Sequence, residues 1–342
     1  MKIGIVGYQG SGKSTLFHWL TGVAPDPSLT HSTQIAAAEV PDLRVQPLCD
    51  IYQPKKITQA TLNLIDTPGL NRDHEGSAGK LALIREAGCM IIVVAAFSGA
   101  KAVDDLTNFE DDLLLADLDI VAGRVEKLRE SVKKPRPNRD KEIAELEALE
   151  PVLAQLEEGK SVRELELNEI QEKVTKTFQL LTNKPRLVVV NVADDETDPD
   201  SHLQDLSPET QAVAFSVSLQ MDLDQMDAEE RNEFCEEMGV RPYDRGDLLR
   251  SIMNASGQML FFTAGEKEVR TWMIPQGATA QDAAGGIHTD LARGFVRAET
   301  MTCDDLFRLG SEREVKAQNL MRKEHKEYVV QDGDILHILS ST

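Results

Sequence analysis

The chain has 342 residues, of which 41% are hydrophobic and 28% charged, and its formal net charge at pH 7 is -21. This length allows two or three domains. The acidic balance argues against strong non-specific binding to nucleic acid. No apolar run approaches the roughly 20 residues that cross a bilayer, so we expect no membrane partner.

The four cysteines stand far apart, without a C-x-x-C pair, at Cys49, Cys89, Cys235 and Cys303. This spacing favours reduced core residues over disulfides or a metal site. The first apolar strand begins almost at once, which leaves no room for a targeting segment. We therefore expect a cytoplasmic protein.

The first predicted element is a buried strand over residues 3–6, and a complete phosphate-binding loop follows it. Residues 7–14 have the pattern G-x-x-x-x-G-K-[ST], and residues 15–20 are predicted to form a helix. The glycines let successive backbone N–H groups face an anion at the positive end of that helix. We expect Lys13 to reach the β- and γ-phosphates, and the Ser14 hydroxyl to bind Mg²⁺. The expected nucleotide-binding residues of this loop are Gly10, Ser11, Gly12, Lys13, Ser14 and Thr15.

A second apolar strand, over residues 62–65, ends in Asp66-Thr67-Pro68-Gly69. Nucleotide-switch proteins use this D-x-x-G pattern to present an Asp to Mg²⁺ and a glycine N–H to the γ-phosphate. Asp66 is therefore a predicted metal ligand. With Lys13, Asp66 and Gly69 form the predicted catalytic set.

A switch segment between these two motifs should offer a hydroxyl group to the metal. Thr33 is our choice, but Thr30 and Ser32 compete with it. A plain surface loop explains this segment nearly as well.

Three further apolar runs, at residues 90–96, 186–190 and 212–218, suit a parallel sheet covered on both faces. The second run leads into Asn191-Val192-Ala193-Asp194, where GTP-binding switch proteins carry N-K-x-D. The Asp of that motif pairs with guanine and the Lys stem covers the ring, so Val192 leaves the motif half complete. The expected base-binding residues, which fit ATP at least as well as GTP, are Asn191, Val192, Asp194 and Ser216.

Between these runs the chain is rich in Glu, Lys, Leu and Ala at helical spacing. We predict helices over residues 113–131 and 141–156, broken into an antiparallel pair by the prolines of 133–138. A further helix over 165–181 returns to the sheet. A solvated hairpin without a function of its own and a partner-binding arm with a basic tip are equally supported.

The last eighty or so residues read as a small separate module. Residues 269–274 and 295–299 are predicted strands, 281–288 a short helix, and 328–338 a closing hairpin around the turn Gln331-Asp332-Gly333-Asp334. Strands packed on one helix suit a β-grasp-like unit. Because it carries no catalytic cluster, we expect a binding module.

The order of phosphate loop, D-x-x-G-L, helical insertion, N-V-A-D and C-terminal module resembles the YchF-type ATPases, a branch of the Obg-related switch proteins. The stretches of the C-terminal module that resemble the TGS domain of this family are Phe262-Thr263-Ala264-Gly265, Lys267-Glu268-Val269-Arg270, Ile287-His288-Thr289-Asp290, Gly294-Phe295, Arg297-Ala298-Glu299 and Gln331-Asp332-Gly333-Asp334. The similarity spans nearly the whole chain.

We therefore expect an α/β fold in three parts. They are a P-loop nucleotide-binding domain with a mostly parallel sheet (1–112 and 185–257), an inserted antiparallel helical hairpin (113–184) and a C-terminal β-grasp-like TGS domain (258–342). The resemblance implies a cytoplasmic, Mg²⁺-dependent hydrolase that prefers ATP and works as a molecular switch. It also implies association with the ribosome, through ribosomal RNA or protein.

Leu70 follows Gly69, where Ras-like proteins place the Gln that orients the attacking water. An alkyl group cannot orient water, so unaided hydrolysis should be slow, and a partner or a local rearrangement would have to position the water. The alternatives are a GTP-specific switch and a nucleotide-binding scaffold with negligible hydrolysis. A small-molecule kinase would leave D-x-x-G-L, N-x-x-D and the C-terminal module unexplained.

Overall fold

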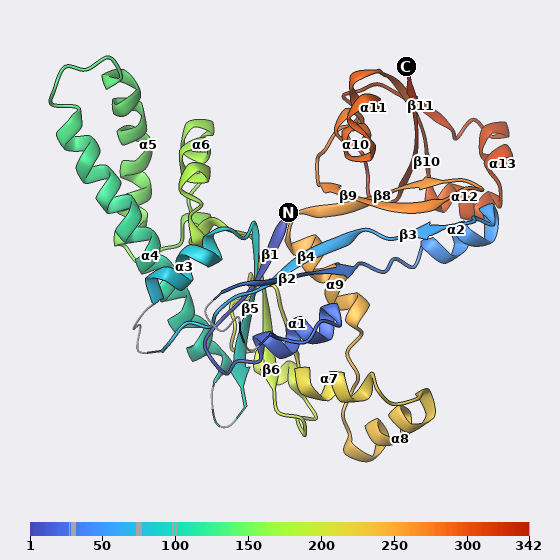
Figure 1. Ribbon diagram of the computed structural model, residues 1–342, viewed down its shortest axis with the longest axis horizontal. Coiled ribbons are helices and arrows are strands. Elements are labelled where there is room, and N and C mark those ends of the chain that lie inside the picture. Colours follow the sequence, from blue (N-terminus) through green and yellow to red (C-terminus); the bar gives the residue numbers. More distant parts are fainter. Residues whose placement is uncertain (27, 29–31, 73–76, 98, 100, 342) are drawn as a thin grey trace. The chain divides into compact units, whose positions relative to one another are not determined.

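The computed structural model describes all residues except 27, 29–31, 73–76, 98, 100 and 342 (Figure 1). The chain folds into two compact units. The first unit consists of residues 1–36 and 63–243, and the second of residues 37–62 and 244–342. No helix in the described ranges is long and apolar enough to span a membrane.

The first unit is built on a sheet of strand order β2-β4-β1-β5-β6-β7. These strands are β1 (Lys2–Val6), β2 (Gln34–Glu39), β4 (Thr61–Asp66), β5 (Cys89–Ala96), β6 (Arg186–Val192) and β7 (Ala212–Phe215). The pairs β1–β4, β1–β5, β5–β6 and β6–β7 are all parallel. The predicted α/β fold with a mostly parallel sheet is confirmed. Parallel strands bring the segments that follow β1, β4 and β6 to one edge of the sheet.

The last strand ends at Phe215, and the polar residues expected to form a loop near the base begin a helix instead. The Ser216 hydroxyl accepts a hydrogen bond from the Leu219 N–H and so caps α7 (Val217–Leu223). A serine cap satisfies a backbone N–H that the first turn of a helix leaves free. The polar residues after Phe215 therefore begin a helix, and α8 (Ala228–Met238) follows it.

The helical insertion starts earlier than predicted, since α4 spans Ala102–Ser131 (Figure 1). Its first turns pack Leu106, Phe109 and Leu113 into the same apolar cluster as residues of β5 and β6. Its later turns join Val121 and other apolar residues to those of α5 (Arg139–Glu157). One helix thus belongs both to the nucleotide-binding sheet and to the antiparallel hairpin.

The helix that returns to the sheet is shorter than residues 165–181. Asn168 caps α6 (Glu169–Phe178) at its start, and Gln179 ends it in the left-handed conformation with φ 50°. Among the described residues, the first unit also contains the 3-10 helices η2 (Val162–Glu164), η3 (Leu181–Asn183) and η4 (Pro199–Leu203).

The carboxylate of Asp117, on α4, is fully buried and joins three segments of the first unit. It accepts hydrogen bonds from the Arg85 guanidinium at 2.6 Å, at the end of α3 (Ser77–Arg85), and from the backbone N–H groups of Leu181 and Thr182 at 3.0 and 2.8 Å. The Thr182 hydroxyl donates a further bond at 2.9 Å. The negative charge is therefore compensated on all sides, as a buried carboxylate requires.

The second unit has a sheet of order β11-β10-β12-β8-β9-β3. Its strands are β3 (Ile57–Thr58), β8 (Gln258–Ala264), β9 (Val269–Pro275), β10 (Phe295–Thr302), β11 (Arg322–Glu324) and β12 (Asp334–Ser340). Its helices are α2 (Val45–Tyr52), α9 (Arg245–Ala255), α10 (Ala280–Ile287), α11 (Thr289–Arg293), α12 (Cys303–Leu309) and α13 (Glu312–Ala317). All four cysteines of the chain are free.

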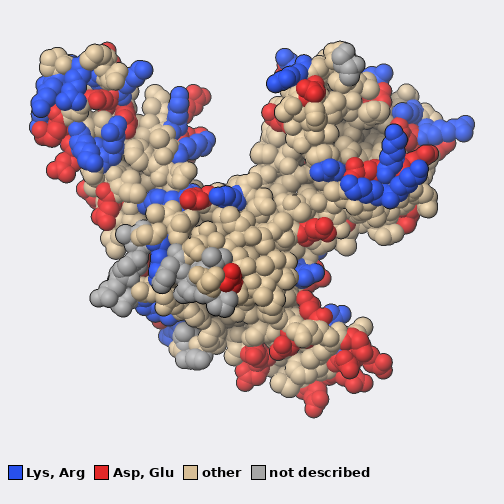
Figure 2. All heavy atoms as spheres, viewed as in Figure 1, with Lys and Arg blue, Asp and Glu red and all other residues tan. Residues whose placement is uncertain are grey.

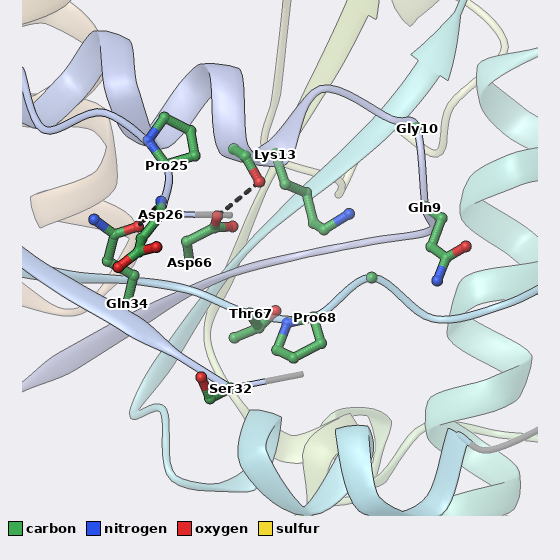
Figure 3. Close-up of a pocket in the computed structure, with 12 residues that line it drawn as sticks. Gln9, Gly10, Lys13, Pro25, Asp26, Ser32, Gln34, Asp66, Thr67 and Pro68 are labelled. Atoms are coloured by element: carbon green, nitrogen blue, oxygen red, sulfur yellow. Dashed lines mark hydrogen bonds between the residues drawn. The ribbon is translucent and has the colours of Figure 1, made fainter. Parts of the chain in front are cut away.

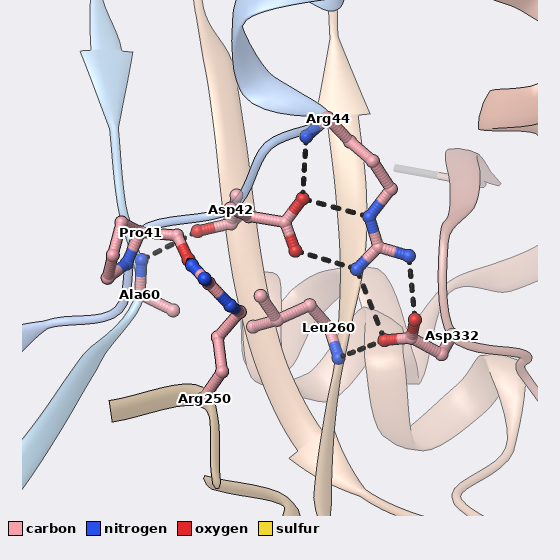
Figure 4. A network of polar contacts seen from close by, with 8 residues as sticks. Pro41, Asp42, Arg44, Ala60, Arg250, Leu260 and Asp332 are labelled. Carbon is pink, nitrogen blue, oxygen red and sulfur yellow. Dashed lines mark hydrogen bonds and ion pairs between the residues drawn. The ribbon is translucent and has the colours of Figure 1, made fainter. Parts of the chain in front are cut away.

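The second unit includes residues 37–62 and begins at 244, whereas the sequence placed both segments in the nucleotide-binding domain. β3 pairs in parallel with β9, and α2 packs Val45 and Leu48 against Phe262 and Met301. Arg44 pairs with Asp42 of the same segment at 2.7 Å, and it links this segment to the turn before β12 through an ion pair with Asp332 at 2.6 Å (Figure 4). These contacts join residues far apart in the sequence, so no local pattern reports them.

The predicted closing hairpin over 328–338 is wrong. Val329 forms only an isolated bridge with Thr279, while β12 pairs antiparallel with β10 and parallel with β8. The Asp334 carboxylate accepts hydrogen bonds from the Tyr328 hydroxyl and the Gln331 N–H at 2.7 and 2.9 Å. These side-chain contacts and the bond from the Asp334 N–H to the Gln331 carbonyl oxygen at 3.1 Å hold the turn, without pairing between its two arms.

Asp117→Ala should destabilise the first unit by about 3 kcal/mol or more, because it leaves the Arg85 guanidinium and two buried N–H groups without an acceptor. Urea unfolding followed by circular dichroism measures this loss. Glu150→Ala is the matched control, since its ion pair with Arg129 is about half exposed and should contribute less than about 1 kcal/mol. Equal losses in the two variants would contradict the anchoring role of Asp117.

Candidate nucleotide-binding site

The phosphate loop connects β1 to α1 (Lys13–Thr21) through residues in the left-handed region. Gly7, Gly10 and Gly12 have φ values of 144°, 79° and 101°. A Cβ atom at Gly7 would lie 2.4 Å from the Val93 carbonyl oxygen, and one at Gly12 would lie 2.3 Å from Asn191 Nδ2. Both glycines are therefore required by close packing as well as by φ. The resulting loop opens at a helix N-terminus, which attracts phosphate.

The loop forms one side of a pocket of about 460 Å³ (Figure 3). Lys13 and Ser14 from the loop meet Asp66 and Gly69 from the end of β4 in this pocket. The full set of lining residues is Gln9, Gly10, Lys13, Ser14, Pro25, Asp26, Ser32, Gln34, Asp66, Thr67, Pro68 and Gly69.

The Lys13 side chain is only 6% exposed, and its ammonium group donates a hydrogen bond to the Tyr8 carbonyl oxygen at 2.6 Å. Burial lowers the pKa of Lys13 to about 8, although the nearby Asp66 carboxylate acts in the opposite direction. A Cβ at Gly69 would lie 2.7 Å from Lys13 Nζ, so the ammonium group sits directly against this glycine. Bound phosphate would compensate this buried positive charge.

Asp66 and Ser14 form a site that suits Mg²⁺. The Ser14 hydroxyl donates to Asp66 Oδ2 at 2.7 Å, while the buried Asp66 Oδ1 has no hydrogen-bond partner among the described residues. Burial raises the pKa of Asp66, against the effects of the Ser14 hydrogen bond and the Lys13 charge. Mg²⁺ typically takes one or two protein carboxylates and fills its octahedron with phosphate and water oxygens. The described residues contain no group of three or more His, Cys, Asp or Glu placed to hold a metal by themselves.

The switch segment reaches the pocket through Ser32 and Gln34, while Thr33 between them does not line it. The Gln34 carboxamide is already bonded, since it accepts from the Asp26 N–H and donates to the Ala24 carbonyl oxygen, both at 3.0 Å. Thr30 lies outside the described residues. Ser32 is thus the described hydroxyl of this segment that faces the phosphate loop.

Asn191 ties the phosphate loop to the start of α7. Its Nδ2 donates to the Ser11 carbonyl oxygen and its Oδ1 accepts from the Val217 N–H, both at 3.0 Å. The side chain is 7% exposed, and both ends of its carboxamide are in use. The sequence did not predict that Asn191 would bridge these two segments, because the N-x-x-D pattern does not show which backbone groups the Asn side chain bonds to.

Asp194 and Ser216 lie together at the expected base site. Asp194 Oδ1 accepts hydrogen bonds from the hydroxyls of Ser216 and Ser218. Val192, in contrast, is the last residue of β6 and is 3% exposed within the apolar cluster of the sheet. The structure therefore places Val192 away from the position of a base cover.

The segment after D-x-x-G is joined to the phosphate loop. Leu70 pairs with Tyr8 in a parallel bridge, and the Lys80 ammonium donates to the Gly69 carbonyl oxygen at 2.7 Å. The Tyr8 hydroxyl donates to Asp112 on α4 at 2.8 Å. Sequence reasoning missed the roles of Tyr8 and Lys80, because neither occupies a defined position of the two motifs.

Comparisons with known proteins agree with this geometry. A family model described as 50S ribosome-binding GTPase matches residues 2–192, and the C-terminal YchF model, described as a protein of unknown function, matches residues 259–340. The ribosome-binding ATPase YchF of Bacillus subtilis is 32% identical, over 98% of both chains. The Obg-like ATPase 1 of Oryza sativa subsp. japonica is 35% identical, over 98% of this chain and 91% of its own.

The chain belongs to the YchF/Obg-like ATPase family. A solved structure of the Schizosaccharomyces pombe YchF GTPase has the same fold, with a TM-score of 0.82 and 28% identity over 99% of this chain and 97% of its own. The resemblance inferred from the motifs is confirmed. Family membership also supports assigning the pocket around Lys13 as the nucleotide site of a P-loop NTPase.

Lys13→Ala should weaken triphosphate binding by at least tenfold, because it removes a charge-assisted contact to the β- and γ-phosphates. Titration of a fluorescent ATP analogue against the purified protein measures this effect. Lys2→Ala is the control, since Lys2 is half exposed and pairs with Glu86 on the surface. Unchanged binding in Lys13→Ala would overturn the assignment of the loop.

Proposed function

We propose that this protein binds ATP with Mg²⁺, hydrolyses it slowly, and acts as a nucleotide-dependent switch that associates with ribosomes in the cytoplasm. The observation that carries this proposal is the pocket in which Lys13, Ser14, Asp66 and Gly69 meet, where the buried Asp66 Oδ1 has no partner in the part of the chain that the structure describes. The names of the bacterial and plant relatives support ATP as the nucleotide, and those of the bacterial relatives support the ribosome as the partner.

The residues act in separate ways on the triphosphate. The backbone N–H groups from Gly10 to Ser14 and the Lys13 ammonium hold the phosphates, and the Gly69 N–H faces the terminal one. The Ser14 hydroxyl and the Asp66 carboxylate hold the metal, with Ser32 as the switch ligand. Bound Mg²⁺ supplies charge stabilisation at the phosphate oxygens. The helical hairpin and the TGS-like module are the parts that we expect to contact partners.

The serine contacts of Asp194 favour adenine over guanine. Guanine presents two N–H donors, and a carboxylate pairs with both only when both of its oxygens are available. In this chain one oxygen already accepts from two hydroxyl groups. A GTP-specific switch remains the second candidate, since the N-terminal family model is described as a GTPase.

ATP should therefore bind at least as tightly as GTP, and Ser218→Ala should shift the preference towards GTP because it frees part of Asp194 Oδ1. Titration of labelled ATP and GTP against the nucleotide-free protein measures both effects. A tenfold or greater preference of the wild-type protein for GTP would reverse the base assignment. Turnover of labelled ATP, with and without ribosomes, separates a slow switch from a scaffold that does not hydrolyse.

The free end of the helical hairpin is the surface that best suits a ribosomal partner. Residues 127–141 carry seven Lys or Arg side chains against two carboxylates, in a chain of net charge -21. Figure 2 shows these side chains gathered where α4 and α5 meet. Lys134 and Arg136 line an open groove of about 580 Å³ at this end. Such a basic surface attracts RNA phosphate by counterion release.

Reversing two of these charges in Lys134→Glu/Arg136→Glu should lower ribosome association by tenfold or more at low salt, while ATP turnover by the free protein stays unchanged. Co-sedimentation with ribosomes over a range of salt concentrations measures the effect. The matched control is Lys173→Glu/Lys176→Glu, which makes the same charge change on the exposed face of α6. Equal losses in both double variants would indicate a general effect of net charge and not a site at the hairpin tip.

A further inference from the structure

The residue after D-x-x-G cannot act on water in this protein. Leu70 is fully buried in the apolar cluster that includes Val6, Ile84 and Phe109. Its backbone is also fixed, because its N–H donates to the Gly7 carbonyl oxygen at 3.1 Å and its carbonyl oxygen accepts from the Gln9 N–H at 2.9 Å. Neither the side chain nor the position is available for orienting a nucleophile.

The same backbone bonds place Gln9 on the opposite side, towards the phosphates. Gln9 follows Tyr8 at the start of the turn that leads into the phosphate loop. Tyr8 and Leu70 face the core, whereas Gln9 is exposed and lines the phosphate pocket with Gly69. A Cβ at Gly69 would lie 2.9 Å from the backbone nitrogen of Gln9 and 3.0 Å from its Cα.

Gln9 therefore meets Lys13 at the glycine that faces the terminal phosphate. In Figure 3 the Lys13 side chain extends towards Gln9 at this end of the pocket. Among the described residues, the Gln9 carboxamide has no hydrogen-bond partner. The other glutamine of the pocket, Gln34, is held at both ends of its carboxamide. Two described cations after Gly69 are also engaged, Lys80 with the Gly69 carbonyl oxygen and Arg72 with Asp105.

We propose that Gln9, a residue of the phosphate loop itself, positions the water that attacks the terminal phosphate. A carboxamide suits this task, because its oxygen accepts a hydrogen bond from water while its NH₂ group donates to a phosphate oxygen. The water oxygen forms a bond to the γ-phosphorus, and the bond from that phosphorus to the β,γ-bridging oxygen breaks. The proton passes to a phosphate oxygen, since a carboxamide is not a base, and the products are ADP and inorganic phosphate.

This inference rests on the proposed ATP hydrolysis and deepens it. In Ras-like switch proteins the glutamine that orients the water follows D-x-x-G, whereas in this protein the corresponding carboxamide would belong to the phosphate loop. The interaction forms only as the water approaches, so it should contribute to the rate and not to the affinity for ATP.

Gln9→Leu in the full-length protein should lower single-turnover hydrolysis of ATP by tenfold or more, as expected for loss of a transition-state hydrogen bond. Its dissociation constant for a fluorescent ATP analogue should stay within twofold of wild type. Gln9→Ala, which adds no exposed alkyl surface, should behave in the same way. Gln46→Leu is the matched control, because Gln46 is an exposed residue of α2 in the second unit.

A transition-state mimic gives a second readout that a structural role would not change. Aluminium fluoride with Mg²⁺ should tighten ADP binding to the wild-type protein by tenfold or more, and this gain should be lost in Gln9→Leu while binding of ADP alone is kept. A Gln9→Leu protein with wild-type rate and gain, or with a parallel loss of rate and ATP affinity, would overturn the assignment of Gln9. A wild-type protein that neither hydrolyses ATP nor responds to aluminium fluoride would contradict the proposed function as well.

Discussion

The parallel pairing of β1 with β4 is the constraint on which the nucleotide site depends. Its register sets Ile5 opposite Asp66, so the phosphate loop and the D-x-x-G segment leave the sheet at the same level. The Thr67 N–H and hydroxyl both bond to the Ile5 carbonyl oxygen, at 3.3 and 2.7 Å, and extend this pairing beyond the strands. The contact between Ser14 and Asp66 follows directly from this register. A slip of one residue would turn the Asp66 side chain to the other face.

The site holds polar groups whose burial is unfavourable until a ligand arrives. Lys13 is buried with a lowered pKa, and Asp66 Oδ1 lacks a hydrogen-bond partner among the described residues. An unpaired buried charge costs free energy that the rest of the fold must offset. Triphosphate and Mg²⁺ would supply the missing partners, so ligand binding and local stability are coupled in this pocket.

Helix α4 connects this pocket to the hairpin through a row of buried carboxylates. Asp105 holds Arg72 after D-x-x-G, Asp112 holds Tyr8 in the phosphate loop, and Asp117 holds Arg85 at the end of α3. These three Asp side chains are 7%, 6% and 0% exposed. A single helix thus contacts both phosphate-site segments at one end and carries the basic surface at the other. This arrangement gives the phosphate pocket a physical connection to the helical hairpin.

The sequence by itself determined the phosphate loop, the D-x-x-G segment, the parallel sheet and the family. These features depend on contiguous residues, since a run of backbone N–H groups or a buried strand acts through neighbours along the chain. Only the tertiary structure decided the positions of the Gln9, Asn191 and Val192 side chains, the long start of α4 and the place of residues 37–62. Each of those depends on which distant segments meet: Leu70 takes the core side of the bridge and leaves Gln9 facing the phosphates, and β6 continues far enough to bury Val192. Periodicity reports which residues are apolar or polar, but not which of two facing segments turns its side chain towards the ligand.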